Sequence, residues 1–148
     1  MDLCLGNRED PANDVRSRIY SGTYNFAATL TIPKAIDFHN QLTVEGKQAR
    51  LQYLRNYWVT RVRQIEGIEI LTPDDPARYG ATTSFRLKGM RTGQEGARFT
   101  SREYRILTVA RKKIAKGSVV RVTPALYSTT AELDRLVAAL KQESAVLT

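Results

Sequence analysis

The sequence predicts an α/β protein of the α+β type, in which a small, mostly antiparallel sheet is backed by helices. Short β-branched or apolar runs between turn-forming residues indicate strands at 68–71, 82–87, 104–110 and 119–123. Apolar residues at helical spacing indicate helices at 44–65 and 130–141. The length of 148 residues, with 42% apolar and 26% charged residues, fits one globular core.

The best-defined part of the pattern is a strand followed by a capped helix. Its strand contains Val119, Val120 and Val122, which favour a pleated backbone, and should stop before Pro124, which has no N–H to donate. The helix begins with a capping box and continues with apolar residues at i, i+3, i+4 and i+7: Thr129 and Glu132, then Leu133, Leu136, Val137 and Leu140.

Arg121 therefore sits near the end of a mostly buried strand. A guanidinium brought into such a place needs an anion, and its planar fork matches a carboxylate or a phosphate. The residues alone leave two interpretations open: a salt bridge to an internal Asp or Glu, or a binding site for an anionic ligand.

The N-terminal region divides into a lead-in and a long helix. Residues 1–19 are predicted to be an irregular connecting segment, because they are polar and show no periodicity. Gly22 and Thr23 lie in a tight turn that enters the next helix. The turn either caps that helix or binds a phosphate through its free N–H groups. That helix, 26–41, carries Pro33 as a possible kink and is apolar on more than one face, which indicates contact with something beyond this small domain.

The connections between the other elements are predicted from glycine and charge. The helix at 44–65 is expected to end at Gly67. Residues 88–98 contain three glycines and few apolar residues, so a loop is expected there, and 112–117 is expected to be a basic turn.

Several side chains are interpreted without a catalytic role. Cys4 is an incidental thiol, and His39 is a surface histidine near a helix end. Asp74 and Asp75 are expected to be solvated, and we predict no metal site. No run approaches the roughly 20 apolar residues of a membrane span and no signal peptide is recognisable, so a cytoplasmic location is expected.

Four motifs resemble the class V aminotransferases, the pyridoxal-phosphate enzymes that include cysteine desulfurases and isopenicillin N epimerase-like proteins. The resemblance extends from about residue 18 to residue 140 and is nearest to the epimerase-like group. Its motifs are Ser-Gly-Thr-x-Asn at 21–25, Leu-Arg-Asn-Tyr-Trp-Val at 54–59, Leu-Thr-Pro-Asp-Asp-Pro at 71–76, and Arg-Val-Thr-Pro-x-Leu-Tyr-x-Thr from 121.

The resemblance implies roles for particular residues. Arg121 matches the arginine that binds the α-carboxylate of the amino-acid substrate. Thr23, with Gly22 beside it, matches the turn whose threonine helps to hold the cofactor phosphate across the interface of a homodimer. Residues 20–148 would then be the C-terminal small domain of a fold-type I pyridoxal-phosphate enzyme.

The same resemblance implies what this sequence lacks. Family members bind the cofactor through a lysine in a Ser/His-Lys context on a large domain, and none of the seven lysines here has that context. The large cofactor domain is therefore expected to be absent, and the chain alone to be inactive, with no covalently bound pyridoxal phosphate. The helix usual in the family before the third strand is also in doubt here.

The alternative is a non-catalytic module that binds nucleic acid or another protein. A net charge of +8 is compatible with a polyanionic partner. The basic residues are interleaved with acidic ones and with no aromatic stripe for base stacking, which makes nucleic acid the weaker interpretation.

Overall fold

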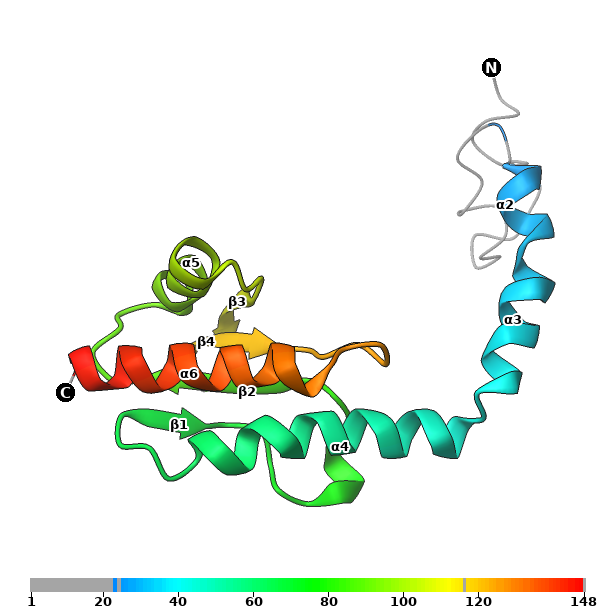
Figure 1. Cartoon of the computed structure of the whole chain (residues 1–148). Coiled ribbons are helices and arrows are strands. Elements are labelled where there is room, and N and C mark those ends of the chain that lie inside the picture. Colours follow the sequence, from blue (N-terminus) through cyan, green and yellow to red (C-terminus); the bar gives the residue numbers. More distant parts are fainter. Residues whose placement is uncertain (1–22, 24, 116, 148) are drawn as a thin grey trace. The chain divides into compact units, whose positions relative to one another are not determined.

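The computed structural model describes residues 23, 25–115 and 117–147, and the chain divides into two compact units, 1–41 and 42–148. The first unit contains α2 (Phe26–Leu30) and α3 (Ile32–Gln41) (Figure 1). The predicted helix is thus interrupted at Thr31, because Pro33 has no N–H to continue the hydrogen-bond ladder. The predicted lead-in, residues 1–19, lies outside the described residues.

The second unit is a four-stranded antiparallel sheet with helices, which confirms the predicted fold class. The sheet order is β1-β2-β4-β3, and all three strand pairs are antiparallel. Its elements in chain order are α4 (Val44–Val62), β1 (Ile68–Ile70), the 3₁₀ helix η2 (Pro76–Arg78), β2 (Thr83–Leu87), α5 (Gly93–Tyr104), β3 (Val109–Ile114), β4 (Gly117–Val122) and α6 (Thr130–Leu147).

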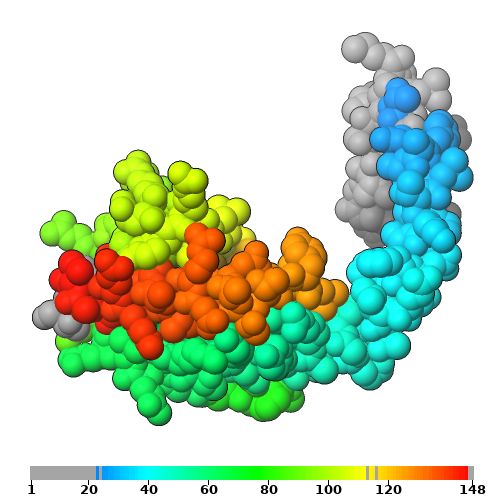
Figure 2. Space-filling view, viewed as in Figure 1, coloured from blue at the N-terminus to red at the C-terminus, as the bar shows by residue number. Residues whose placement is uncertain are grey.

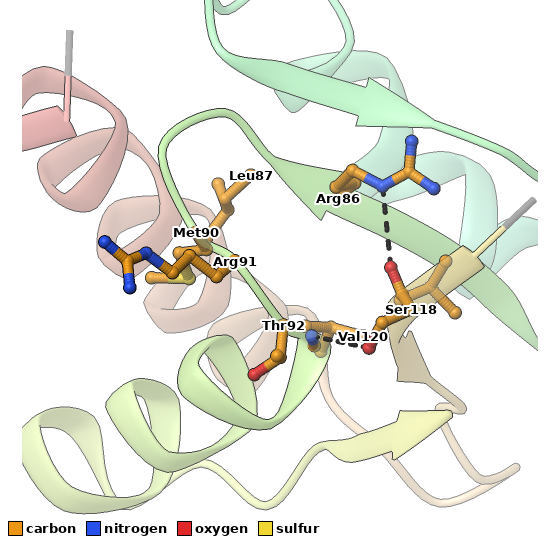
Figure 3. A pocket seen from close by; sticks show the side chains of 9 residues that line it. Arg86, Leu87, Met90, Arg91, Thr92, Ser118 and Val120 are labelled. Atoms are coloured by element: carbon orange, nitrogen blue, oxygen red, sulfur yellow. Dashed lines mark hydrogen bonds between the residues drawn. The ribbon is translucent and has the colours of Figure 1, made fainter. Parts of the chain in front are cut away.

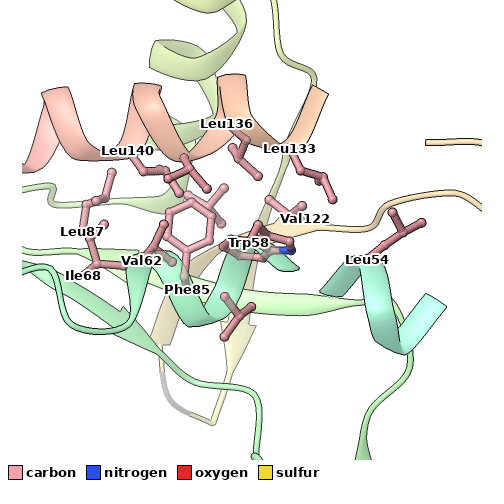
Figure 4. Packing of buried hydrophobic residues seen from close by; sticks show 13 residues of the cluster. Leu54, Trp58, Val62, Ile68, Phe85, Leu87, Val122, Leu133, Leu136 and Leu140 are labelled. Atoms are coloured by element: carbon pink, nitrogen blue, oxygen red, sulfur yellow. The ribbon is translucent and has the colours of Figure 1, made fainter. Parts of the chain in front are cut away.

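The core lies between one face of the sheet and the helices α4 and α6. Figure 2 shows α6 lying along α4, and the Tyr57 hydroxyl of α4 donates to Asp134 of α6 at 2.9 Å. Trp58 of α4 meets Phe85 of β2 edge to face, with ring centroids 6.1 Å apart (Figure 4). Around this pair is a continuous apolar cluster: Leu54, Val59, Val62, Ile68, Leu87, Val120, Val122, Leu133, Leu136, Val137 and Leu140.

The other face of the sheet is different in character, and we call it the open face. Side chains alternate along a strand, so residues between those of the core point to this second face. Cross-strand register places on it Glu69, Ser84, Arg86, Val109, Arg111, Val119 and Arg121. Of these seven only Val119 is buried; the others are exposed or half-buried.

The loop predicted at 88–98 is wrong, because α5 begins at Gly93. Thr92 caps it by accepting from the Glu95 N–H, and Glu95 accepts from the Arg91 N–H, a capping box that the glycines obscured. Two of those glycines are buried against β4. These two glycines allow α5 to pack closely against β4, and they do not mark a flexible loop.

The third strand is shifted toward the C-terminus relative to its predicted range. Because α5 continues to Tyr104 and ends with Arg105 in a left-handed conformation, residues 105–108 connect the helix to β3. The predicted basic turn at 112–117 therefore falls mainly within β3, an edge strand. Exposed charge on an edge strand discourages pairing with other chains.

Both long helices also differ from prediction at their ends. Helix α4 stops at Val62, and Gly67, with φ of 85°, lies in the turn that enters β1 instead of ending the helix. Helix α6 begins at the predicted capping box and runs to Leu147, beyond the predicted 141. None of the described helices is long and apolar enough to cross a membrane.

Replacing Gly93 with alanine should destabilise the second unit. A Cβ at this position would lie 2.1 Å from the Val119 carbonyl oxygen, so α5 or β4 must move. We expect Gly93→Ala to cost on the order of 1–3 kcal/mol or more, as overpacked sites do. Urea unfolding measures this, with Gly80→Ala as the control, since nothing lies within 4 Å of a Cβ there. Equal midpoints for the two variants would contradict the packing role.

The helices of the first unit should make the chain associate with itself. Both lack buried residues among those described, and their large apolar side chains are exposed: Phe26 69%, Leu30 79%, Ile32 52%, Ile36 53% and Phe38 58%. Such a surface marks an interface or an aggregation risk. We expect light scattering and hydrophobic-dye binding to increase with salt, which screens the +8 charge. A dye-free monomer at high salt would contradict this.

Candidate functional site

Arg121 occupies the position before the last residue of β4, on the open face. Its Nε is buried and has no hydrogen-bond partner among the described residues. The other buried side-chain atoms in that condition, Arg55 Nε, Trp58 Nε1 and Thr83 Oγ1, belong to α4 or to the core side of β2. Among the described residues of the open face, Arg121 therefore has the buried side-chain atom that lacks a hydrogen-bond partner.

The cross-strand neighbours of Arg121 in the described sheet are not acidic. It lies opposite Ser84 of β2 on one side and Val109 of β3 on the other. No carboxylate of the described residues pairs with it. The internal salt bridge that the sequence left open is thus not found within the described part of the chain, which favours an anion from outside it.

The loop that follows Arg121 is fastened to α4 by Arg50, a residue that sequence reasoning missed. Arg50 Nη2 donates to the Ser128 carbonyl at 2.9 Å, and its Nε donates to the Leu126 carbonyl at 3.4 Å. Ser128 Oγ accepts from the Ala125 N–H at 3.1 Å. The clamp holds the loop while leaving Tyr127, at its tip, 88% exposed. No sequence signal connects residues nearly 80 positions apart.

Two of the cavities near the sheet contain polar groups that are bonded within the chain. One, of about 190 Å³, lies between α5 and β4, where Ser118 Oγ accepts from the Gly93 N–H (Figure 3). The other, of about 270 Å³, lies beside the end of β4. There Glu132 belongs to the capping box of α6, and Arg135 donates to the Tyr104 carbonyl. We assign neither a ligand.

Thr23 and Gly22, the predicted phosphate-binding residues, belong to the first unit. Thr23 is exposed and precedes Asn25, whose side chain caps α2 by accepting from the Ala28 N–H at 3.0 Å. Gly22 lies outside the described residues. The cap predicted at this turn is therefore present at Asn25, and the phosphate role of Thr23 stays a prediction.

Asp74 is not simply solvated, as the sequence suggested, but joins the segment after β1 to α4. It accepts hydrogen bonds from Arg63 and, at 3.2 Å, from Arg55, which is only 3% exposed. The hydrogen bond from Arg63 has the largest effect and lowers the pKa of Asp74. Desolvation opposes it by a smaller amount, and the hydrogen bond from Arg55 lowers the pKa further. Arg55 also lies 4.0 Å from the centre of the Tyr79 ring. Asp74 therefore neutralises a buried cation.

Solved structures share this fold. A cysteine desulfurase from Thermococcus onnurineus NA1 matches with a TM-score of 0.75 and 14% identity, over 88% of this chain and 34% of that one. A cysteine desulfurase from Escherichia coli matches with a TM-score of 0.71 and 18% identity, over 86% and 33%. At such identities the likeness concerns the fold, which is that of one part of fold-type I pyridoxal-phosphate enzymes.

Sequence comparison places the chain in a family. The model of aminotransferase class-V matches residues 4–136, so the chain belongs to the class-V aminotransferase family. It is 30% identical to isopenicillin N epimerase of Amycolatopsis lactamdurans over 93% of this chain and 34% of the relative. For the enzyme of that name from Streptomyces clavuligerus the values are 29%, 80% and 30%. The chain spans about a third of the length of these relatives.

Removing the Asp74 carboxylate should destabilise the fold above about pH 4. Its pKa is depressed in the folded state, so its contribution is present above the unfolded-state pKa and disappears as pH falls through the folded value. We expect Asp74→Asn to lower the urea midpoint at pH 7, with the difference from the original chain shrinking toward pH 3.

Asp75→Asn is the matched control, because Asp75 only caps the short η2 helix, through the Ala77 N–H. Equal losses for the two variants at pH 7 would show that the Arg55 and Arg63 contacts contribute nothing.

Proposed function

We propose that this chain is the C-terminal, substrate-carboxylate-binding part of a pyridoxal-phosphate-dependent class V aminotransferase-like enzyme that acts on an amino acid. The observation that carries the proposal is Arg121, whose buried Nε has no partner on an open sheet face without a neighbouring acid. Family membership and the likeness to isopenicillin N epimerases support it.

Arg121 suits the recognition of an α-carboxylate. A guanidinium presents parallel N–H groups that meet both oxygens of a carboxylate, and such charge-assisted pairs are stronger than neutral hydrogen bonds. Because Arg121 is delivered by a sheet strand and its flanking loop is fastened by Arg50, the bound carboxylate would be held in one orientation. A fixed carboxylate fixes the α-carbon, where the chemistry of this family takes place.

The described residues around Arg121 are better suited to binding the substrate than to attaching the cofactor covalently. Register surrounds Arg121 with Ser84, Val109 and Val119, and with no lysine among them. When bound, pyridoxal phosphate supplies an electron sink for reactions at the α-carbon. We propose that the attachment lysine belongs to a large domain outside this chain, so that the chain alone neither catalyses nor holds the cofactor covalently.

The remaining roles follow from the same proposal. Thr23 and Gly22 would contact the cofactor phosphate across a homodimer interface in the complete enzyme. The large domain would cover apolar surface that the isolated chain leaves exposed, including that of α2 and α3.

In an enzyme that joins this chain to its large domain, Arg121→Lys should reduce kcat/KM for the amino acid. The ammonium cannot reproduce the two-pronged contact, and a loss on the order of 2–4 kcal/mol is expected for a charge pair broken in a desolvated site. Steady-state kinetics measures this.

Arg98→Lys on the exposed side of α5 is the control for a general effect of exchanging an arginine. Unchanged kinetics in Arg121→Lys would assign Arg121 a purely structural role and overturn the proposal.

A further inference from the structure

The open face contains a second arginine without a partner. Arg111 of β3 is exposed, lies on the same face as Arg121, and makes no hydrogen bond or ion pair with any described residue. The third arginine of the face is different, since Arg86 pairs with Glu69 at 3.1 Å. Glu69, the single acid among the seven residues of the open face, therefore pairs with Arg86. The charges of Arg111 and Arg121 are not compensated by any described residue.

Register fixes how these two arginines are arranged. Val109 lies opposite Arg121, and Arg111 lies opposite Val119. Arg111 and Arg121 are consequently diagonal neighbours on adjacent antiparallel strands, a relation that separates backbones by about 7–8 Å and lets long side chains converge. Val109, which is 37% exposed, and Val119, which is buried, occupy the other diagonal.

From this arrangement we infer that the open face binds a dianion: a molecule with two carboxylates joined by a short aliphatic spacer. Arg121 takes one carboxylate, Arg111 takes the other, and the spacer lies beside the exposed side chain of Val109. This inference rests on the proposed function and narrows it, because the substrate becomes an amino acid whose side chain also carries an anionic group. Arg111 is then a specificity-determining residue.

Charge and packing favour this ligand over a simple amino acid. A monocarboxylate would neutralise Arg121 and leave Arg111 beside it unpaired, whereas a second carboxylate compensates both guanidiniums. Two like charges at diagonal positions also repel, so each anionic group gains from the field of both cations. The exposed side chain of Val109 gives an aliphatic spacer an apolar surface that a polar ligand would not use.

The test uses the 148-residue chain and two probes of equal length, glutarate and pentanoate. Binding is followed through the arginine Nε–Hε resonances in NMR titrations at fixed ionic strength. We expect glutarate to bind on the order of tenfold more tightly than pentanoate, as one added charge-assisted contact would give. Arg111→Gln should remove that advantage, while pentanoate binding should weaken only by the small effect of losing a neighbouring charge.

Arg98→Gln controls for the loss of one positive charge, because it makes the same change in net charge on α5, away from the open face. It should preserve the preference for glutarate. Equal binding of the two probes, or an equal loss in both variants, would overturn the dianion site and indicate that Arg111 faces another protein segment or solvent.

The outcome for Arg121→Gln separates this inference from the proposed function. Loss of both probes in that variant, without a preference for glutarate in the original chain, would overturn only the dianion site. Retention of pentanoate binding in Arg121→Gln would overturn the carboxylate role of Arg121, and the proposed function with it.

Discussion

The packing of Trp58 against Phe85 is the contact on which the second unit depends. It joins the C-terminal half of α4 to the middle of β2, and both side chains are fully buried. Aromatic side chains of this size bury so much surface that truncating one costs about 3–5 kcal/mol in typical cores. Because α6 packs against the same cluster, this contact decides which face of the sheet becomes the core.

Because one face of the sheet packs in the core, the polar side chains of the candidate site lie on the other face. Every second residue of β2, β3 and β4 is turned away from the helices, and those residues include three arginines. Glu69 compensates Arg86, while Arg111 and Arg121 are left without an acid among the described residues. The site is thus a consequence of strand alternation as much as of any single residue.

Polar contacts between segments that are distant in the sequence fix the loops beside the sheet. Arg50 fastens the loop after β4. Asp74 ties the segment after β1 to Arg55 of α4 and to Arg63, the residue that follows this helix. Both contacts originate on α4, which therefore supports the core through one side and the connecting loops through another. This explains how a small sheet keeps long loops in place without disulfides.

The sequence by itself determined the strand that delivers Arg121, the capping box and the helix after it, because these depend on β-branching and on short-range hydrogen bonds. It also identified the family through ordered motifs. Only the tertiary structure decided that the glycines at 93 and 96 lie within α5, since their reason is close contact with β4. Tertiary structure likewise decided the partners of Arg50 and Asp74, and the diagonal of Arg111 and Arg121. These follow from sheet register and helix packing between residues far apart in the chain, which no local pattern encodes.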